Sequence, residues 1–144
     1  MVMKRPIPTD AIVMGQEGAL GQVFRNLIDN ARSFSPERGV VTVTLQTERS
    51  KEGGTVRAIV EDEGPGIPAD NLETIFRRFY TERPKGAAFG GNSGLGLSIA
   101  RQIVSAHNGR VYAQNVEGAG ARLIVELPQA LIARPLPPRE RRVD

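Results

Sequence analysis

The sequence predicts an α+β protein, a two-layer α/β sandwich of four or five strands and three helices. Apolar residues recur with a helical period in three segments and alternate as in strands in four or five others. The two kinds of segment do not alternate strictly along the chain, which disfavours a doubly wound parallel sheet. A length of 144 residues with 40% hydrophobic residues allows one domain with a packed core.

The first predicted elements are a short strand and a long helix. Residues 1–10 have mixed polarity and two prolines, and we expect them to form a lead-in to an edge strand at Ala11–Met14. The segment from Gly18 to Phe34 predicts a helix, because its apolar residues recur at i, i+4 and i+8. This apolar stripe consists of Ala19, Leu20, Val23, Phe24, Leu27, Ile28 and Ala31. Ser35-Pro36 ends the helix, since the residue before a proline avoids helical geometry.

A hairpin and a short helix are expected next. Val40–Thr47 and Thr55–Asp62 alternate between apolar and polar residues and flank a short turn at Lys51–Gly54, as the two strands of a β-hairpin do. A short helix at about Asp70–Phe79 then presents several apolar side chains on one side: Leu72, Ile75, Phe76 and Phe79.

The remaining predicted elements are one helix and two strands. A glycine-rich stretch from Gly86 to Gly96 has no periodicity and precedes a helix at about Leu97–Ala106. The strands Arg110–Val116 and Ala121–Leu127 follow, separated by a turn. We therefore expect one domain over residues 11–128, followed by a Pro/Arg-rich tail over residues 129–144.

Composition excludes several classes of function. The absence of cysteine excludes disulfides, thiol catalysis and cysteine-ligated metals, and the single histidine, His107, excludes a multi-histidine metal site. A net charge of +3 with only 5% aromatic residues and no tryptophan disfavours nucleic-acid binding. No apolar run is long enough to span a bilayer, so we expect a soluble domain without direct membrane contact.

Polar residues on the first long helix are the first candidate site. Gln22, Asn26 and Asn30 stand at i, i+4 and i+8, so they form an uncharged polar stripe beside the apolar one. Asparagine oxygens suit a hard divalent cation. On this helix alone, hydrogen bonds that cap a neighbouring loop are the more frequent use of such residues.

Asp62 and the turn after it are the second candidate. Strand alternation places Asp62 at the end of an apolar face, where a buried carboxylate needs a hydrogen-bond donor. The following Glu63-Gly64-Pro65-Gly66-Ile67-Pro68 turn allows a planar ring to approach the backbone. Such a carboxylate suits a heterocycle that bears an amine, although an aspartate that only caps the turn is an equally common reading.

The third candidate is the run Asn92-Ser93-Gly94-Leu95-Gly96-Leu97-Ser98, which opens a helix. Backbone N–H groups at a helix start, with no side chain at Gly94 or Gly96, form a site for anions such as phosphates. The lysine of a P-loop is absent, and taken alone such a run is usually a flexible connector.

Together, in this order and spacing, the three features resemble the catalytic, ATP-binding domain of bacterial sensor histidine kinases, in the gyrase/chaperone/kinase/mismatch-repair ATPase superfamily. The resemblance covers about residues 11–128 and implies a Bergerat-type fold, a mixed sheet of about five strands with three helices on one face. Its four boxes are similar to Asn26-Leu27-Ile28-Asp29-Asn30-Ala31, Asp62-Glu63-Gly64-Pro65-Gly66-Ile67, Ile75-Phe76-Arg77-Arg78-Phe79-Tyr80 and Gly94-Leu95-Gly96-Leu97. The segment Phe79–Ser93 also resembles the ChvG-type envelope sensors of alpha-proteobacteria.

The resemblance assigns roles to particular residues. It implies that Asn30 coordinates Mg²⁺ bridging the phosphates of ATP, and that Asp62 accepts a hydrogen bond from the adenine amino group. It further implies that the adenine or its surroundings are contacted by Phe34, Gly64, Gly66 and Ile67. It implies that the phosphates are contacted by Gly94, Leu95, Gly96 and Leu97. Thr81–Ser93 would form a mobile ATP lid. Arg78, Arg83 or Lys85 would supply positive charge to the phosphates, because Ser33 stands where many relatives have a lysine.

The implied activity is donation of the γ-phosphate of ATP to a histidine on a separate, upstream dimerisation domain, which then passes the phosphate to a response regulator. The resemblance places this domain in the cytoplasm, in a parent protein of the bacterial inner membrane. The alternatives on the same fold are a self-contained ATPase and an anti-sigma-type serine kinase; a nucleotide-sensing module without catalysis is a third. ATPases of the superfamily have a glutamate that activates water where this chain has Asn26, so Asn26 favours phosphotransfer.

Overall fold

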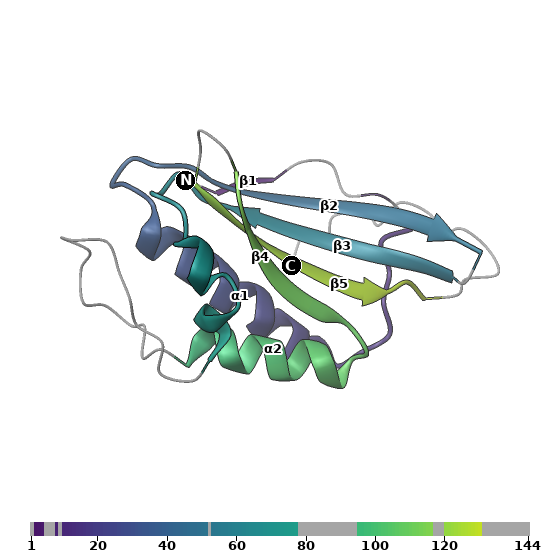
Figure 1. The fold of residues 1–144 in the computed structure, drawn as a ribbon. Coiled ribbons are helices and arrows are strands. Elements are labelled where there is room, and N and C mark those ends of the chain that lie inside the picture. The colour runs from purple at the N-terminus through teal and green to yellow at the C-terminus, as the bar shows by residue number, and fades with distance from the viewer. Residues whose placement is uncertain are drawn as a thin grey trace.

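The computed structural model describes residues 2–4, 8, 10–51, 53–77, 95–116 and 120–130 (Figure 1). Its elements are, in chain order, β1 (Val2–Lys4), α1 (Glu17–Phe34), β2 (Val41–Ser50), β3 (Gly53–Glu61), the 3₁₀ helices η1 (Ala69–Asn71) and η2 (Thr74–Phe76), α2 (Gly96–Ala106), β4 (Arg110–Asn115) and β5 (Ala121–Pro128). Arg78, Gly94, the predicted lid at 81–93 and residues 131–144 of the predicted tail lie outside the described residues.

The five strands form one mixed sheet in the order β1-β2-β3-β5-β4. The β1–β2 pair is parallel and the other three pairs are antiparallel. The register places Val43 opposite Val60 and Val60 opposite Leu123, so one face of the sheet is continuously apolar. The prediction of a mixed sheet of about five strands is confirmed.

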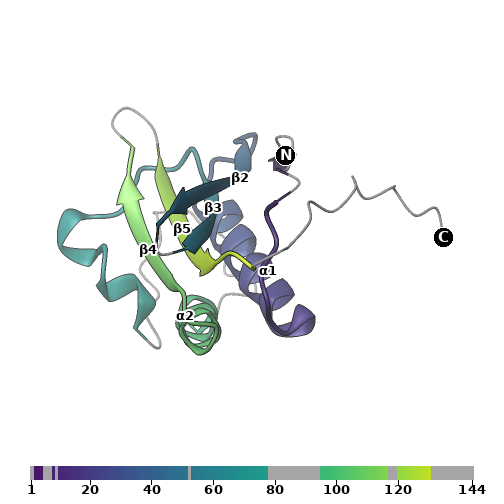
Figure 2. The same ribbon diagram turned by 90° about the vertical axis from the view of Figure 1, so that its right-hand side faces the viewer.

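Both α-helices lie on this apolar face, and together they form the second layer (Figures 1 and 2). The periodicity of α1 is the cause, since Val23, Leu27 and Ala31 lie on one side of the helix and are fully buried. Ala100 and Val104 are the equivalent residues of α2. The core between the layers is completed mainly by Val41, Ala58, Val60, Val111, Leu123, Val125 and Leu127 of the sheet.

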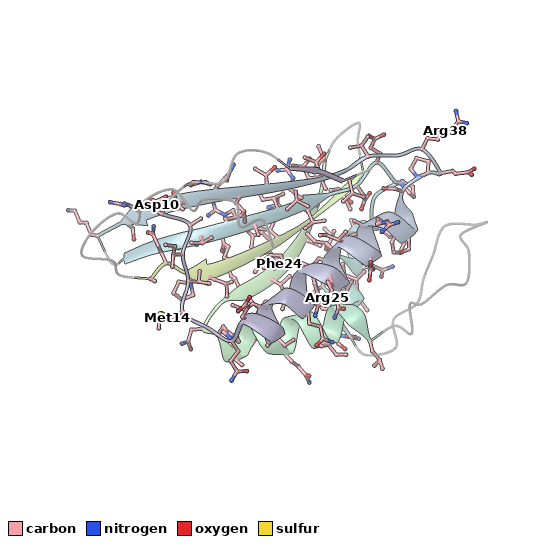
Figure 3. The ribbon with its side chains drawn as sticks, turned by 180° about the vertical axis from the view of Figure 1, so that it is seen from behind. Asp10, Met14, Phe24, Arg25 and Arg38 are labelled. Carbon is pink, nitrogen blue, oxygen red and sulfur yellow. The ribbon has the colours of Figure 1, made fainter. Side chains whose placement is uncertain are left out.

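The predicted edge strand at Ala11–Met14 is wrong, because the edge strand is β1, at Val2–Lys4. Residues 10–14 instead cross from the end of the β2–β3 hairpin to the start of α1, as the positions of Asp10 and Met14 in Figure 3 show. Isolated contacts hold this segment. Ala130 N–H donates to Ile12 O, and Asp10 accepts hydrogen bonds from Thr47 and Arg49.

The predicted third helix at Asp70–Phe79 is also corrected. Two 3₁₀ helices, η1 and η2, replace it within the described part of this segment, which ends at residue 77. The adjacent residues Ile75 and Phe76 are both buried, and this differs from the i, i+3 and i+4 spacing by which an α-helix buries one stripe. Short i→i+3 turns accommodate two neighbouring buried side chains, with Arg77 N–H bonded to Thr74 O at 2.9 Å.

Candidate functional site

Asp62 follows β3 directly and continues its apolar face, in agreement with the prediction. The side chain is buried, with 9% of its surface exposed. Its Oδ1 atom accepts two backbone hydrogen bonds, from Gly64 N–H at 2.8 Å and from Ala121 N–H at 3.1 Å. The backbone N–H of Asp62 in turn donates to Ala121 O at 3.0 Å. These bonds hold the carboxyl group in one orientation between two segments of the chain.

The electrostatics of Asp62 are those of a buried acceptor. Burial raises the pKa of this carboxyl above its ordinary value, and the N–H groups of Ala121 and Gly64 offset only part of the shift. Within the described residues, Oδ2 accepts no hydrogen bond, whereas Oδ1 accepts two. One oxygen therefore anchors the group, and the other is available to a donor from a ligand.

Glycines allow the chain to close around Asp62. A Cβ atom on Gly64 would lie 2.3 Å from Phe34 O, at the end of α1, so no side chain fits there. Gly66 has a φ of +85°, which glycine adopts without the strain of other residues. Gly120 was not among the predicted site residues, yet its Cβ would lie 2.3 Å from Asp62 Oδ1. The sequence signal for Gly120 was only a glycine-containing turn between two strands.

Ile67 is held by a side chain that sequence reasoning also missed. Asn115, the last residue of β4, accepts a hydrogen bond from Ile67 N–H at 2.7 Å and donates one to Ile67 O at 2.6 Å. The loop after β3 therefore has two supports, the turn that precedes β5 and the end of β4. Ile67 itself packs against the hydrophobic core.

The two predicted asparagines of α1 differ in their surroundings. Asn26 donates from Nδ2 to Gly96 O at 3.1 Å and so joins α1 to the first residue of α2. At the other end of the helix pair, Gln16 N–H donates to His107 Nε2 at 3.1 Å. The two helices are therefore antiparallel, and hydrogen bonds join them near both ends of α2. The start of α2 lies beside the middle of α1 (Figure 1).

Asn30 lies one turn after Asn26 and is half-buried. Its side chain makes no hydrogen bond to any described residue, and its backbone carbonyl accepts one from Ser33 Oγ at 2.8 Å. An amide oxygen that no described residue contacts by a hydrogen bond is able to coordinate a cation. The described residues contain no group of three or more His, Cys, Asp or Glu side chains that would hold a metal alone. A cation at Asn30 would thus need further ligands from a bound molecule or from water.

The predicted phosphate contacts begin where the description of the chain resumes, at Leu95. Leu95 O accepts hydrogen bonds from Ile99 N–H and Ser98 Oγ, both at 2.9 Å, and the helix α2 starts at Gly96. The side chain of Leu97 is buried in the core, so only its backbone is available to a ligand. Phe34 is half-buried at the end of α1.

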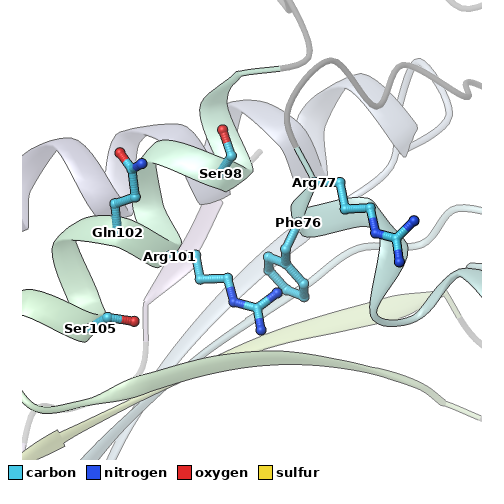
Figure 4. Close-up of a pocket in the computed structure, with 6 residues that line it drawn as sticks. All are labelled: Phe76, Arg77, Ser98, Arg101, Gln102 and Ser105. Atoms are coloured by element: carbon cyan, nitrogen blue, oxygen red, sulfur yellow. The ribbon is translucent and has the colours of Figure 1, made fainter.

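A shallow cavity of about 660 Å³ lies between η2 and the outer side of α2 (Figure 4). The guanidinium of Arg101 lies 5.8 Å from the centre of the Phe76 ring and pairs with Glu73 at 3.0 Å. Of the residues predicted to contact the nucleotide, none that the structure describes lines this cavity; its described lining consists of Phe76, Arg77, Ser98, Arg101, Gln102 and Ser105. Phe76 is buried, as predicted for a core residue.

Comparison with known proteins identifies the family to which this geometry belongs. The family model "Histidine kinase-, DNA gyrase B-, and HSP90-like ATPase" matches residues 15–131, which include every described part of the site. The chain belongs to this ATPase family. The resemblance drawn from the four boxes is thereby confirmed at the level of the family.

Relatives within this ATPase family narrow the comparison. The sensor protein ChvG of Rhizobium meliloti (strain 1021) is 50% identical over 125 residues, which cover 81% of this chain and 21% of that protein. The signal transduction histidine-protein kinase BaeS of Escherichia coli (strain K12) is 39% identical over 123 residues, 85% of this chain and 25% of that protein. The chain thus spans about a fifth to a quarter of the length of these curated relatives. The ChvG resemblance is confirmed.

Solved structures of the family share the fold. The mycobacterial sensor histidine kinase MprB matches with a TM-score of 0.69 at 30% identity, over 94% of this chain and 81% of that one. Full-length ShkA in complex with AMPPNP matches with a TM-score of 0.70 at 31% identity, over 94% of this chain and 27% of that one. The domain is therefore homologous to the catalytic ATP-binding domains of sensor histidine kinases.

Proposed function

We propose that this domain binds Mg·ATP and presents the γ-phosphate to a histidine on a separate dimerisation and phosphoacceptor domain. The observation that carries the proposal is the asymmetric environment of Asp62. One carboxylate oxygen is saturated by two backbone donors, and the other accepts no bond from the described residues. A carboxylate that is fixed through one oxygen, with the other oxygen available to a ligand, suits the exocyclic amino group of adenine.

The glycine loop supports an adenine at this place. Asp62 Oδ2 would accept from the amino group, while Gly64 and Gly66 leave the backbone open to the planar ring. Ile67, packed on the core, would contact the ring, with Phe34 near the nucleotide. Guanine presents a carbonyl oxygen where adenine presents the amino group, so Asp62 would repel guanine. The related ShkA structure contains AMPPNP, an analogue of ATP.

The phosphates and the metal would lie between α1 and the start of α2. Mg²⁺ usually takes one or two protein oxygens, with phosphate oxygens and waters as its other ligands, and the half-buried Asn30 side chain fits that pattern. When bound, the ion would neutralise charge on the phosphates. Backbone N–H groups of Gly94 to Leu97 would bind the phosphate oxygens, and the charge of Arg78 would assist.

Asn26 supports phosphotransfer over hydrolysis. A hydrolase needs a base to activate water, and a carboxamide cannot accept the proton. Here the Asn26 amide is already a donor to Gly96 O, which gives it a positioning role between the two helices. The acid stability of the product distinguishes a histidine kinase from the serine-kinase alternative, because phosphohistidine is acid-labile and phosphoserine is acid-stable.

The proposed partners and location follow from the same relatives. We propose that an upstream dimerisation domain carries the acceptor histidine, that a cognate response regulator receives the phosphate, and that this domain lies on the cytoplasmic side of an inner-membrane parent protein. The relatives named as sensor proteins support this. Across the described ranges, no helix combines the length and hydropathy needed to cross a membrane.

Calorimetric titration with a non-hydrolysable ATP analogue tests the nucleotide site. We expect binding that strengthens when Mg²⁺ is present and that discriminates against the matching GTP analogue. Asp62→Asn should weaken binding of the ATP analogue about ten- to a hundredfold, as expected for loss of a charged hydrogen-bond partner. Asp70→Asn, the same substitution at an exposed carboxylate, is the matched control. Unchanged affinity and unchanged base preference in Asp62→Asn would refute the adenine contact.

A further inference from the structure

Asn115 makes an unusual contact for an exposed residue at the end of a strand. Its carboxamide forms two hydrogen bonds with the backbone of a single residue, accepting from Ile67 N–H at 2.7 Å and donating to Ile67 O at 2.6 Å. This is the pattern that a neighbouring strand would offer to Ile67. Asn115 belongs to β4, which is separated from β3 by β5, so the side chain connects segments that the sheet itself does not pair.

The register explains how Asn115 reaches the loop. Asn115 lies opposite Ala121, and Ala121 in turn accepts a hydrogen bond from Asp62 N–H and donates one to the Asp62 carboxylate. The three residues form a row across the end of the sheet. Alternation from Val111 places Asn115 on the face that carries the helices, the same face as Asp62. Asn115 therefore supports the loop from the side of the proposed adenine site.

The loop depends on this contact for its shape beyond Gly64. Gly64 N–H is bonded to Asp62, but among the described residues the hydrogen bonds of Ile67 come from Asn115 alone. Gly66 has a positive φ, a conformation that glycine adopts without the strain of other residues. The Asn115 Oδ1 atom also lies 3.0 Å from the Cβ position of Gly66, so a larger group at the tip would displace the loop.

We propose that Asn115 is a positioning residue for the nucleotide base: by clamping the backbone of Ile67, it holds Gly66 and Ile67 where adenine contacts them. This inference rests on the proposed function. A carboxamide suits the task because it presents one acceptor and one donor side by side. Aspartate has the same shape but presents an oxygen to Ile67 O, and leucine has nearly the same shape with neither bond.

The test compares Asn115→Leu and Asn115→Asp with the wild type, using an ATP analogue and the matching GTP analogue in the presence of Mg²⁺. Loss of both hydrogen bonds in Asn115→Leu, or of the bond to Ile67 O in Asn115→Asp, should weaken binding of the ATP analogue, about tenfold for the leucine variant, and bring the ratio of the two dissociation constants closer to one. Gln114→Leu, at the exposed neighbouring position on β4, is the matched control and should bind like the wild type.

The ratio of the dissociation constants separates positioning from general destabilisation, since a domain that is only less stable loses affinity for both analogues alike. Urea unfolding of each variant verifies that it is folded during the titration. An unchanged ratio in both folded Asn115 variants, beside a wild type that prefers the ATP analogue, would overturn this inference and leave the proposed function standing. A wild type that binds neither analogue would refute the proposed function itself.

Discussion

At the scale of single residues, Asp62 would give the proposed nucleotide site its chemical character, and its charge costs stability. Burial raises the pKa of Asp62, and the donors at Ala121 and Gly64 only partly compensate. A carboxylate kept this dry remains in place because the backbone bonds to Oδ1 fix it. Residues of this kind are often more useful to a ligand than to the fold.

The raised pKa predicts a pH-dependent effect of Asp62→Asn on stability. Between the ordinary pKa and the raised one, the folded domain binds a proton here that the unfolded chain has released. The contribution of Asp62 to stability is therefore full below the ordinary pKa and is lost as pH rises through the folded pKa. Asparagine has no such loss, so Asp62→Asn should gain stability relative to the wild type as the pH rises above the ordinary pKa of an aspartate, about 4.

Urea unfolding of both proteins at pH values below and above the ordinary pKa, without nucleotide, measures the difference in unfolding free energy. Asp70→Asn should show no comparable trend with pH, since Asp70 is exposed. A difference in unfolding free energy that is independent of pH would mean that burial does not raise the pKa of the Asp62 carboxyl.

At the scale of elements, the turn that precedes β5 acts on the site through Gly120. A methyl group there would lie 2.3 Å from Asp62 Oδ1 and 2.7 Å from Gly64 N. Gly120→Ala must therefore move the carboxylate or the turn, at a cost of about 1–3 kcal/mol in stability. We expect a large loss of affinity for the ATP analogue as well, because the anchor of Asp62 is displaced.

Calorimetry and urea unfolding together check this prediction. Gly18→Ala is the matched control, because no atom lies within 4 Å of the Cβ position of Gly18, in the first turn of α1. A Gly120→Ala protein with wild-type affinity and stability would show that the turn does not constrain Asp62.

The opposite face of the sheet is joined by a charged cluster around Glu126. This carboxylate accepts hydrogen bonds from Arg57 on β3 and from Arg110 and Tyr112 on β4, so it connects three strands. Burial alone would raise the pKa of Glu126, but the bonds from Arg110, Arg57 and Tyr112 outweigh it and hold the pKa below its ordinary value. Its stabilising effect is therefore present above the ordinary pKa and is lost as pH falls through the folded one.

Glu126→Gln should destabilise the domain by about 1–2 kcal/mol at neutral pH, a value kept low because Arg57 and Arg110 remain partly solvated. Nucleotide affinity should not change, since the cluster lies on the face away from the helices. Urea unfolding and calorimetry measure the two effects. A loss of affinity in a fully folded Glu126→Gln protein would contradict this separation of the faces.

At the scale of the whole molecule, the domain has a nucleotide site but only one histidine, His107. Its ring is used in structure, since Nε2 accepts from Gln16 N–H and Nδ1 lies 2.8 Å from Ile103 O. Asn26 offers no base for water. This chain should therefore bind Mg·ATP without appreciable self-phosphorylation or rapid hydrolysis.

Addition of the helical dimerisation domain of the parent protein in trans should restore some transfer, at reduced efficiency because the effective concentration of the tethered domain is lost. Radiolabelled ATP incubated with each domain alone and with both together is the measurement. Acid-labile label is expected on the helical domain only when both are present. Label on this chain itself, or rapid phosphate release without the partner, would overturn the proposed division of labour.

Much of the fold and of the site was predictable from the sequence, because the relevant signals are local. The stripe of α1 gives a 3.6-residue period, β3 alternates up to Asp62, and both lie within continuous segments. The predictions at Asp62 and Asn26 likewise depended on runs of a few residues. The two-layer arrangement followed from the order of these segments, whereas the mixed sheet was implied by the family resemblance.

Only the tertiary structure decided the contacts that join distant segments. Asp62 meets Ala121 59 positions later, and Ile67 meets Asn115 48 positions later. No period or short motif encodes such a pairing, because it arises from the register of β3, β5 and β4 across the sheet. The edge strand at Val2–Lys4 was missed for the same reason, since its pairing with β2 is a property of the sheet and not of three residues.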